Sequence, residues 1–522
     1  MNTRSNLIIW LRRPAQTALA SAVCVTLLGA CTVGPDFVRP ATSKDAGYTA
    51  GNTMPGTASA DVAGGASQRF IEAQDIPGQW WSLFHSAPLN ELIDEALKAN
   101  PDVAAAQAAL RQARETVYAD QGALFPSVSA SGSATRERLS GTTFGNSAFS
   151  PTLSVTSASL SVSYAPDVFG GVRRQVESAE AQAEYERFQL EATYLTLTSN
   201  VVNSAVTLAS LRDQIAATQE IIKIETDQLD VVKQRFDLGA VSRADVLTQV
   251  STLSQTRATL PPLQKQLAEA RNQLMTYLGR FPNQDKGESF ELASLSLPEA
   301  LPISLPSKLV EQRPDVRSAE AQLHEASANV GVAIANQLPQ FTITSLLGST
   351  STGFDKLFSP GTAVWSIGGS LAQTIFDAGA GEHRKRAAVA AYDQAEARYR
   401  STVLSAFQDV ANALRALQTD ADALNAQATA ERAATDSLDL AQRQYRIGAI
   451  DYLTLLNAEQ TYQNALLSRV RAQAARYSDT AALFQALGGG WWNRSDVAPG
   501  SEGSPDRLVL PPVQEIRLLG TQ

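Results

Sequence analysis

The sequence predicts a mainly α-helical chain with a small β part, arranged as two tandem copies of one structural unit. The first observation is self-similarity, because Asn100-Pro101-Asp102-Val103 returns as Arg313-Pro314-Asp315-Val316. At nearly the same spacing, Phe236-Asp237-Leu238-Gly239-Ala240 returns as Tyr445-Arg446-Ile447-Gly448-Ala449. The second observation is that very long helical patterns and short alternating segments follow each other in the same order in both halves. Such repetition indicates a repeat architecture.

Each copy is predicted to run helix, strand, loop, strand, long helix, turn and return helix. The opening helices are expected at Pro101 to Leu124 and Pro314 to Leu338, because each has a proline in its first turn and stops before another. The long helices are expected at Val172 to Asp237 and Gly381 to Arg446, and their return helices at Arg243 to Leu278 and Tyr452 to Leu487. A helix of about 65 residues reaches ~100 Å, a length typical of bundled or supercoiled helices.

The short segments alternate between apolar and small polar residues, as half-buried strands do. In the first copy the alternating residues are Ala158, Leu160, Val162 and Tyr164 against Ser157, Ser159, Ser161 and Ser163. In the second they are Trp365, Ile367, Gly369 and Leu371 against Ser366, Gly368, Ser370 and Ala372. Hairpin partners are expected at Ser127 to Thr135 and Phe341 to Leu347. Each copy therefore contributes one β-hairpin.

Four strands of this length suit a bilayer, but four cannot close a barrel. A tilted membrane strand needs ~9 to 11 residues, and the smallest membrane barrels use about eight strands. Open sheet edges are not tolerated in lipid, so several chains must pool their strands. Three copies would form a twelve-stranded barrel with a lumen. The alternative is a water-soluble β-domain with two hairpins.

The N-terminus reads as a secretory signal followed by a lipid attachment site. Arg4, Arg12 and Arg13 precede a short apolar run that ends in Leu28-Gly29-Ala30-Cys31, which resembles a bacterial lipobox. Cys31 would then carry S-diacylglycerol and an N-palmitoyl group, and the following Thr32 favours delivery to the outer membrane. An ordinary signal that leaves a free thiol is the alternative. The mature chain would have no cysteine pair, so disulfides are excluded.

The predicted organisation is a signal peptide at 1–30, a lipidated N-terminal segment at 31–88, repeat one at 89–280, an inter-repeat segment at 281–306, repeat two at 307–488 and a C-terminal tail at 489–522. The N-terminal segment, the inter-repeat segment and the C-terminal tail are rich in Gly, Pro and Ser, so they are expected to be irregular and to form an equatorial belt. Pro261-Pro262 is expected to interrupt the first return helix. The resulting kink should be specific to the first copy, because the second copy has Val470-Arg471 there.

The turns between long and return helices carry clear boundary signals. Gly239 and Gly448 suit the left-handed position after a helix end. Ser242 and Asp451 stand where an N-cap belongs, and Asp245 completes a capping-box pattern with Ser242.

Composition and motifs argue against enzymatic, metal-binding and nucleic-acid functions. The three histidines are scattered, and the chain has neither a His-Glu-x-x-His nor a Cys-x-x-Cys motif. A net charge of -9, more negative once the signal arginines are removed, argues against nucleic acid as a partner. No catalytic residue, metal ligand or cofactor is expected beyond the lipid on Cys31.

Several motifs together resemble the TolC-like outer-membrane factors, specifically their lipoprotein branch. They are Cys31 to Pro40, Trp80-Trp81-Ser82-Leu83-Phe84, the repeated Pro-Asp-Val and the two glycine turns. The resemblance covers essentially the whole mature chain. It implies a homotrimer with a twelve-stranded barrel in the outer membrane, continued by a twelve-helix periplasmic tunnel. It also implies a periplasmic adaptor and an inner-membrane transporter, often of the proton-driven RND class, as partners.

The resemblance places the periplasmic aperture and the adaptor-docking surface at the two turns. The residues concerned are Phe236, Gly239, Ser242, Asp245, Leu247, Tyr445, Arg446, Gly448, Asp451, Thr454 and Asn457. Relatives commonly have an aspartate ring where this chain has Asn457. A neutral ring would weaken cation preference, and Asp436, Asp439 or Asp451 is the hypothetical source of what remains. For Asp451, the N-cap role is the alternative to a pore role.

The function these features predict is passive conduction of drugs or other small molecules through the outer-membrane duct of a tripartite efflux pump. One alternative is a duct for polypeptide export with an ATP-driven partner. The other is a structural periplasmic lipoprotein with coiled-coil arms and no pore. The cargo and the particular adaptor are not encoded in any motif.

Overall fold

The computed structural model describes residues 32–41, 47–48, 56–140, 142 and 150–494. The predicted signal, Cys31 and most of the C-terminal tail lie outside the described residues. The chain divides into two compact units. Among described residues, unit 1 holds 32–40, 108–140, 142, 150–187 and 318–401, and unit 2 holds the remainder. The predicted fold class is confirmed, because long helices dominate and four strands form the larger sheet.

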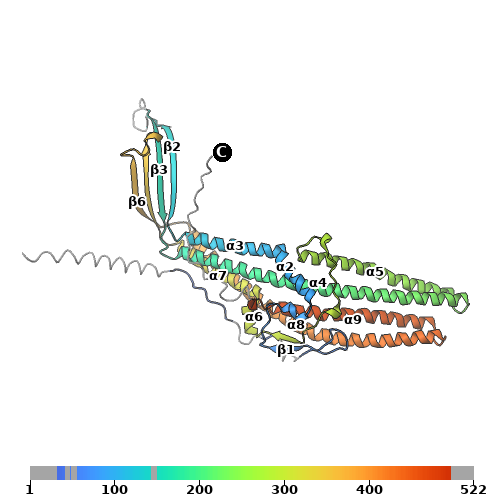
Figure 1. Cartoon of the computed structure of the whole chain (residues 1–522). Helices are drawn as coiled ribbons and strands as arrows, with labels where there is room; N and C mark the ends of the chain where they lie inside the picture. The colour runs from blue at the N-terminus through green and yellow to red at the C-terminus, as the bar shows by residue number, and fades with distance from the viewer. Residues whose placement is uncertain (1–31, 42–46, 49–55, 141, 143–149, 495–522) are drawn as a thin grey trace, which may run out of the picture. The chain divides into compact units, whose positions relative to one another are not determined.

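Unit 1 contains a four-stranded antiparallel sheet in the order β2-β3-β5-β6. The strands are β2 Ser127–Arg138, β3 Thr152–Tyr164, β5 Gln340–Ser351 and β6 Ala363–Ala372. The two predicted hairpins are both present, and pairing of β3 with β5 joins them into one sheet within the chain. Figure 1 shows the strands as long arrows.

The register of this sheet separates a serine-rich face from an apolar face. Ser131 pairs with Ser159 and Ser133 with Ser157, and their hydroxyl oxygens lie 3.0 and 2.8 Å apart. The pairs of the opposite face include Val128 with Val162, Leu160 with Leu347, Leu347 with Trp365 and Phe341 with Leu371. Side chains of paired residues lie on the same face, so the sheet has one polar and one apolar surface.

Both edges of the sheet are open in the described chain. β2 and β6 each have a strand neighbour on one side only, and every residue of both strands is exposed. Unpaired edge strands of 12 and 10 residues present rows of free backbone donors and acceptors.

Residues 32–39, here called the strap, are held in unit 1 by a buried arginine. The side chain of Arg174 is 4% exposed and donates to the carbonyl oxygens of Val33 at 3.1 Å and Gly34 at 3.4 Å. The same guanidinium pairs with Asp36 at 2.7 Å and Glu177 at 2.6 Å. Gly34 lies directly against Gly331, where any Cβ would clash with backbone. The strap is therefore packed closely against the helices that contain Arg174 and Gly331.

The opening and long helices match the predicted elements closely. They are α3 Pro101–Gly122, α7 Pro314–Ala335, α4 Gly171–Asp237 and α8 Ala380–Arg446. All four contribute residues to both units. Asn100 caps α3 by accepting from the backbone N–H of Asp102 at 2.8 Å, which explains why the helix begins at Pro101.

Unit 2 contains two helical hairpins, α4 with α5 Arg243–Tyr277 and α8 with α9 Tyr452–Ala486. The predicted interruption at Pro261-Pro262 is wrong as a break, since α5 runs through both prolines, whereas the kink expected there stays a prediction. The prolines lack the donors that would bond the carbonyls of Arg257 and Ala258. Both of those residues are exposed, so water can satisfy their carbonyls and the helix persists.

The segments flanking the repeats are more ordered than predicted. The inter-repeat segment was expected to be irregular, but β4 Ala300–Ile303 pairs in parallel with β1 Arg69–Glu72. Helices α2 Ala87–Ala99 and α6 Pro306–Gln312 precede the opening helices of the two repeats. A single buried charge explains part of this order. Arg476 donates to the carbonyls of Gly64 and Ala66 and to the side-chain oxygen of Gln68.

In the described part of the chain, no helix has the length and apolar character required to cross a bilayer. Among the same residues there is also no group of histidine, cysteine and carboxylate side chains placed to hold a metal ion.

Candidate functional site at the hairpin tips

The two hairpin tips of unit 2 are built on equivalent turns. Gly239 and Gly448 have φ of 74° and 75°, in the left-handed region where glycine is favoured. In the first turn the N–H of Ala240 donates to the carbonyl of Arg235 at 2.8 Å. In the second, the N–H of Ala449 donates to that of Gln444 at 2.9 Å. These bonds close the long helices with a Schellman-type ending, as the repeated glycines predict.

The return helices begin with the predicted caps. Ser242 accepts from the backbone N–H of Asp245 at 3.3 Å, and Asp245 accepts from the N–H of Ser242 at 2.8 Å, which completes the capping box. Asp451 accepts from the N–H of Thr454 at 2.9 Å and also from its hydroxyl. Hydrogen bonds from Thr454 lower the pKa of Asp451. The capping role of Asp451 is therefore confirmed, whereas a pore role stays a prediction.

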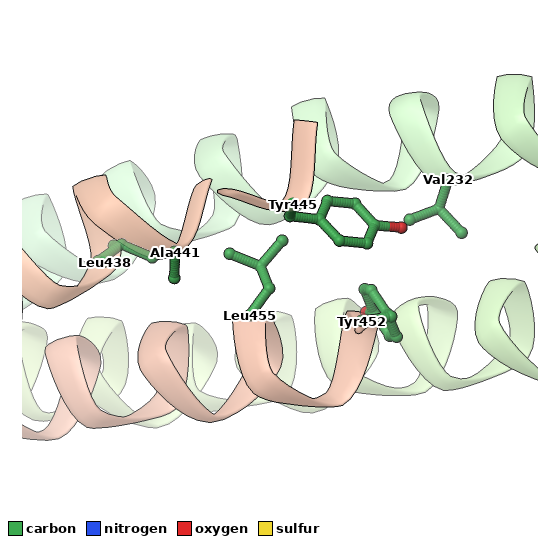
Figure 2. Close-up of a cluster of buried hydrophobic side chains, with 6 residues drawn as sticks. All are labelled: Val232, Leu438, Ala441, Tyr445, Tyr452 and Leu455. Atoms are coloured by element: carbon green, nitrogen blue, oxygen red, sulfur yellow. The ribbon is translucent and has the colours of Figure 1, made fainter. Parts of the chain in front are cut away.

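A buried apolar cluster joins the two tips behind these turns. Val232 of α4 packs with α8 and α9 residues in one cluster. Figure 2 shows Tyr445 and Leu455 pointing into the space between the helices, with Val232 beside the ring of Tyr445. The members are Val232, Leu438, Ala441, Tyr445, Tyr452 and Leu455. Burial of this set stabilises contact between the first and second hairpins.

Arg235 adds a polar tie between the same two tips. Its guanidinium donates to the carbonyl oxygens of Tyr445 and Arg446, both at 2.9 Å. It also lies 4.4 Å from the centre of the Tyr445 ring. The end of α8 has carbonyls without helical donors, so a cation there is favourable. Arg235 therefore fastens the first tip to the last turn of α8.

A second polar connection runs from α9 through α5 to α4. The hydroxyl of Tyr452 donates to the side-chain oxygen of Gln249 on α5. The amide of Gln249 donates to the carbonyl of Glu225 on α4 at 3.0 Å. Burial, with neighbouring carboxylates contributing, raises the pKa of Tyr452, so this phenol stays a donor throughout the physiological range.

The predicted tip residues divide into an exposed group and a packed one. Phe236, Ser242, Asp245, Leu247, Arg446, Asp451, Thr454 and Asn457 lie on or near the surface of the single chain. Tyr445 is 3% exposed, so it packs between the tips instead of presenting a docking face. Asp436 and Asp439 are exposed on α8, and Asp439 is paired with Arg443. The docking and aperture roles themselves stay predictions.

Sequence reasoning missed the residues that connect the hairpins. Glu225, Gln249 and Glu459 are buried polar residues on three different helices. Their positions follow the helical spacing of the buried stripe, since Leu229 and Val232 continue from Glu225 and Leu455 precedes Glu459 by one turn. A polar residue within such a stripe was the available signal.

The fold and the paired tips define a class of channel proteins from the outer membrane. The outer membrane efflux protein family model matches residues 92–280 and 305–489, and this chain belongs to that family. Its two matched stretches coincide with the two repeats.

Individual relatives agree with this assignment. The chain is 30% identical over 485 residues to the probable efflux pump outer membrane protein TtgC of Pseudomonas putida, covering 92% of this chain and 97% of that one. It is 29% identical over 421 residues to the probable outer membrane lipoprotein SilC of Salmonella typhimurium, covering 79% and 88%. The solved outer-membrane channel OprN superposes with a TM-score of 0.79 at 29% identity, covering 88% of this chain and all of that one.

Replacing Arg235 by alanine is expected to loosen the tips. The change removes two charge-assisted bonds and a cation–π contact, which together stabilise the half-exposed tip by about 1–2 kcal/mol. Limited proteolysis within 444–450 should accelerate about tenfold. Arg235→Lys, which retains the charge but lacks the planar guanidinium that lies over the Tyr445 ring, should give an intermediate rate. Equal cleavage of all three proteins would show that this tie does not hold the tips together.

Proposed function

We propose that three copies of this chain form the exit duct of a tripartite efflux pump, through which drugs or other small molecules leave passively. The observation that carries the proposal is the sheet of unit 1. Its edge strands β2 and β6 are open, and one of its faces is apolar. In lipid those edges must be paired, and β6 of one copy pairing with β2 of the next satisfies both. Three sheets of four strands then close into a twelve-stranded barrel.

The two faces of the sheet suit such a wall. In a membrane barrel, apolar side chains face lipid and the small polar ones face the lumen. The face with Ser131, Ser133, Ser157 and Ser159 would line a wet pore without a specific binding site. The long helices of three copies would continue the path through the periplasm, and the tips would form its inner mouth. The duct needs no catalytic group, because a partner transporter supplies the energy.

The partners follow from the same arrangement. A duct whose mouth opens in the periplasm requires a periplasmic adaptor and an inner-membrane transporter, of the RND class in the predicted system. The exposed tip residues Leu238, Leu247, Ile447 and Leu453 offer the adaptor an apolar docking surface. The mature N-terminus would be anchored by acylated Cys31, one residue before the strap.

Purified protein is expected to run as a heat-labile trimer on electrophoresis in mild detergent. The same preparation should give stepwise ion conductance in planar lipid bilayers, since a closed barrel with a wet lumen conducts. A monomeric protein without conductance would instead support the structural lipoprotein with coiled-coil arms. Boiling the same sample before electrophoresis gives the monomer reference.

Growth of producing cells with radioactive palmitate is expected to label the mature chain. Cys31→Ser should abolish the label, because the acylated thiol and amino group belong to that residue. Cys24→Ser is the matched control, since Cys24 lies in the segment that cleavage removes. Label that persists in Cys31→Ser would disprove acylation at this position.

Asn457→Asp is expected to raise the cation preference of the channel several-fold. In a trimer the change adds three carboxylates at an exposed position of the tip region, and rings of carboxylates favour cations. Reversal potentials in asymmetric salt measure the effect. Asn457→Ala, which removes the amide without adding charge, should leave the preference unchanged. An unaltered reversal potential in the aspartate variant would place residue 457 away from the conducting path.

A further inference from the structure

Two buried carboxylates that the duct function does not use lie among the packed helices of the two hairpins, α4 with α5 and α8 with α9, a region referred to below as the layer. Glu225 on α4 is 2% exposed and Glu459 on α9 is 5% exposed. Both oxygens of Glu459 and one oxygen of Glu225 have no hydrogen-bond partner in the described part of the chain. The remaining oxygen of Glu225 accepts from the hydroxyl of Thr256 at 2.8 Å. Three of four carboxylate oxygens are thus buried without a donor.

The surroundings of this pair offer little compensation for negative charge. The titratable and charged groups that act on the layer are Glu225 on α4, Asp245 and Arg257 on α5, Tyr445 on α8, and Tyr452 and Glu459 on α9. Arg257 is the cation of this set, and it acts on Glu225. Two buried like charges without paired cations are strongly unfavourable, so at least one carboxyl must hold a proton while the layer is packed.

We propose that Glu225 and Glu459 form a proton-dependent latch between the hairpins, which holds the tips together when protonated and releases them when the proton is lost. One consequence of the latch rests on the proposed function, namely that separation of the tips widens the duct. The structural basis of the latch is the position of the two carboxylates on opposite hairpins. Loss of the proton leaves two buried like charges that repel each other, and separating the hairpins lets water reach both.

The direction of the pH dependence follows from the electrostatics. Burial, and secondarily the charge of Glu225, raise the pKa of Glu459 from its ordinary 4.5 to about 7. Burial also raises the pKa of Glu225. The packed tips bind the proton of Glu459 more tightly than separated tips do. Packing is therefore fully stabilised at pH values below the ordinary pKa of 4.5. Between 4.5 and about 7, each unit of rising pH favours separation by about tenfold, and the loss is complete above that window.

The test uses purified full-length protein carrying Leu238→Cys and Ile447→Cys, one label site on each tip. Both positions are more than four-fifths exposed, and the mature chain otherwise contains only Cys31. Spin labels on these cysteines, in labelled chains diluted with unlabelled ones, report the distance between the tips of one chain. Pulsed electron paramagnetic resonance should show the long-distance fraction growing from pH 5 to pH 8. Open probability in planar bilayers should rise over the same range.

Glu459→Gln should keep the tips close across the whole range, because the amide stays neutral. Glu225→Gln should retain a weaker response, since burial of Glu459 remains and only the repulsion is removed. Asp227→Asn, an exposed carboxylate on the same helix as Glu225, is the matched control and should behave as the parent protein does.

A pH-independent tip distance in the parent protein, or an unchanged pH response in Glu459→Gln, would overturn the latch. If Glu459→Gln does not fold, the same comparison is made with Glu225→Gln, and a response identical to the parent's refutes the pairing. A pH-dependent distance that is abolished by Glu459→Gln, in protein that never conducts, would support the latch while refuting the duct.

Discussion

The open edges of the four-stranded sheet are the constraint on which the rest of the molecule depends. A strand edge inside lipid has no water to satisfy its backbone groups, so β2 and β6 must find strands elsewhere. One chain provides none in its described residues, which makes assembly a condition of insertion. Closure also accounts for the two different faces of the sheet, because it turns the apolar face toward lipid and the serine-rich face toward the lumen.

A second set of opposing interactions lies at the tips, where two helical hairpins pack against each other. Apolar burial around Tyr445 and Leu455 favours contact, and Arg235 adds a directional tie. The buried carboxylates Glu225 and Glu459 oppose this contact once they are charged. Contact at the tips is therefore a balance between a few interactions, so the proposed latch can separate the hairpins without unfolding their helices.

Local rules predicted most of the fold. The helix bounds at Pro101, Asp237, Arg243, Arg446 and Tyr452 agree with the structure, because prolines, glycines and N-caps act within one turn of where they stand. The strands were recognised from serine alternation, although they extend further than predicted, for instance to Arg138 and Ser351. The pairing of β1 with β4 escaped prediction, since it joins short segments more than two hundred residues apart.

The candidate site was predicted only in part, for a similar reason. Turn glycines and caps are local signals, so Gly239, Ser242, Gly448 and Asp451 were identified from the sequence. The ties between hairpins depend on which helix faces which, and no local pattern specifies that. Tyr445 shows the difference, because the sequence motif contains it while its burial against the facing hairpin became visible only in three dimensions.

The two prolines within α5 make the hairpins mechanically unequal. Helix α9 has a complete ladder of donors at the equivalent point, whereas α5 lacks two of them at Pro261 and Pro262. A helix without those bonds bends under less force. A load applied at both tips would therefore flex the first hairpin before the second, so two arms that began as copies of one unit have come to differ in stiffness.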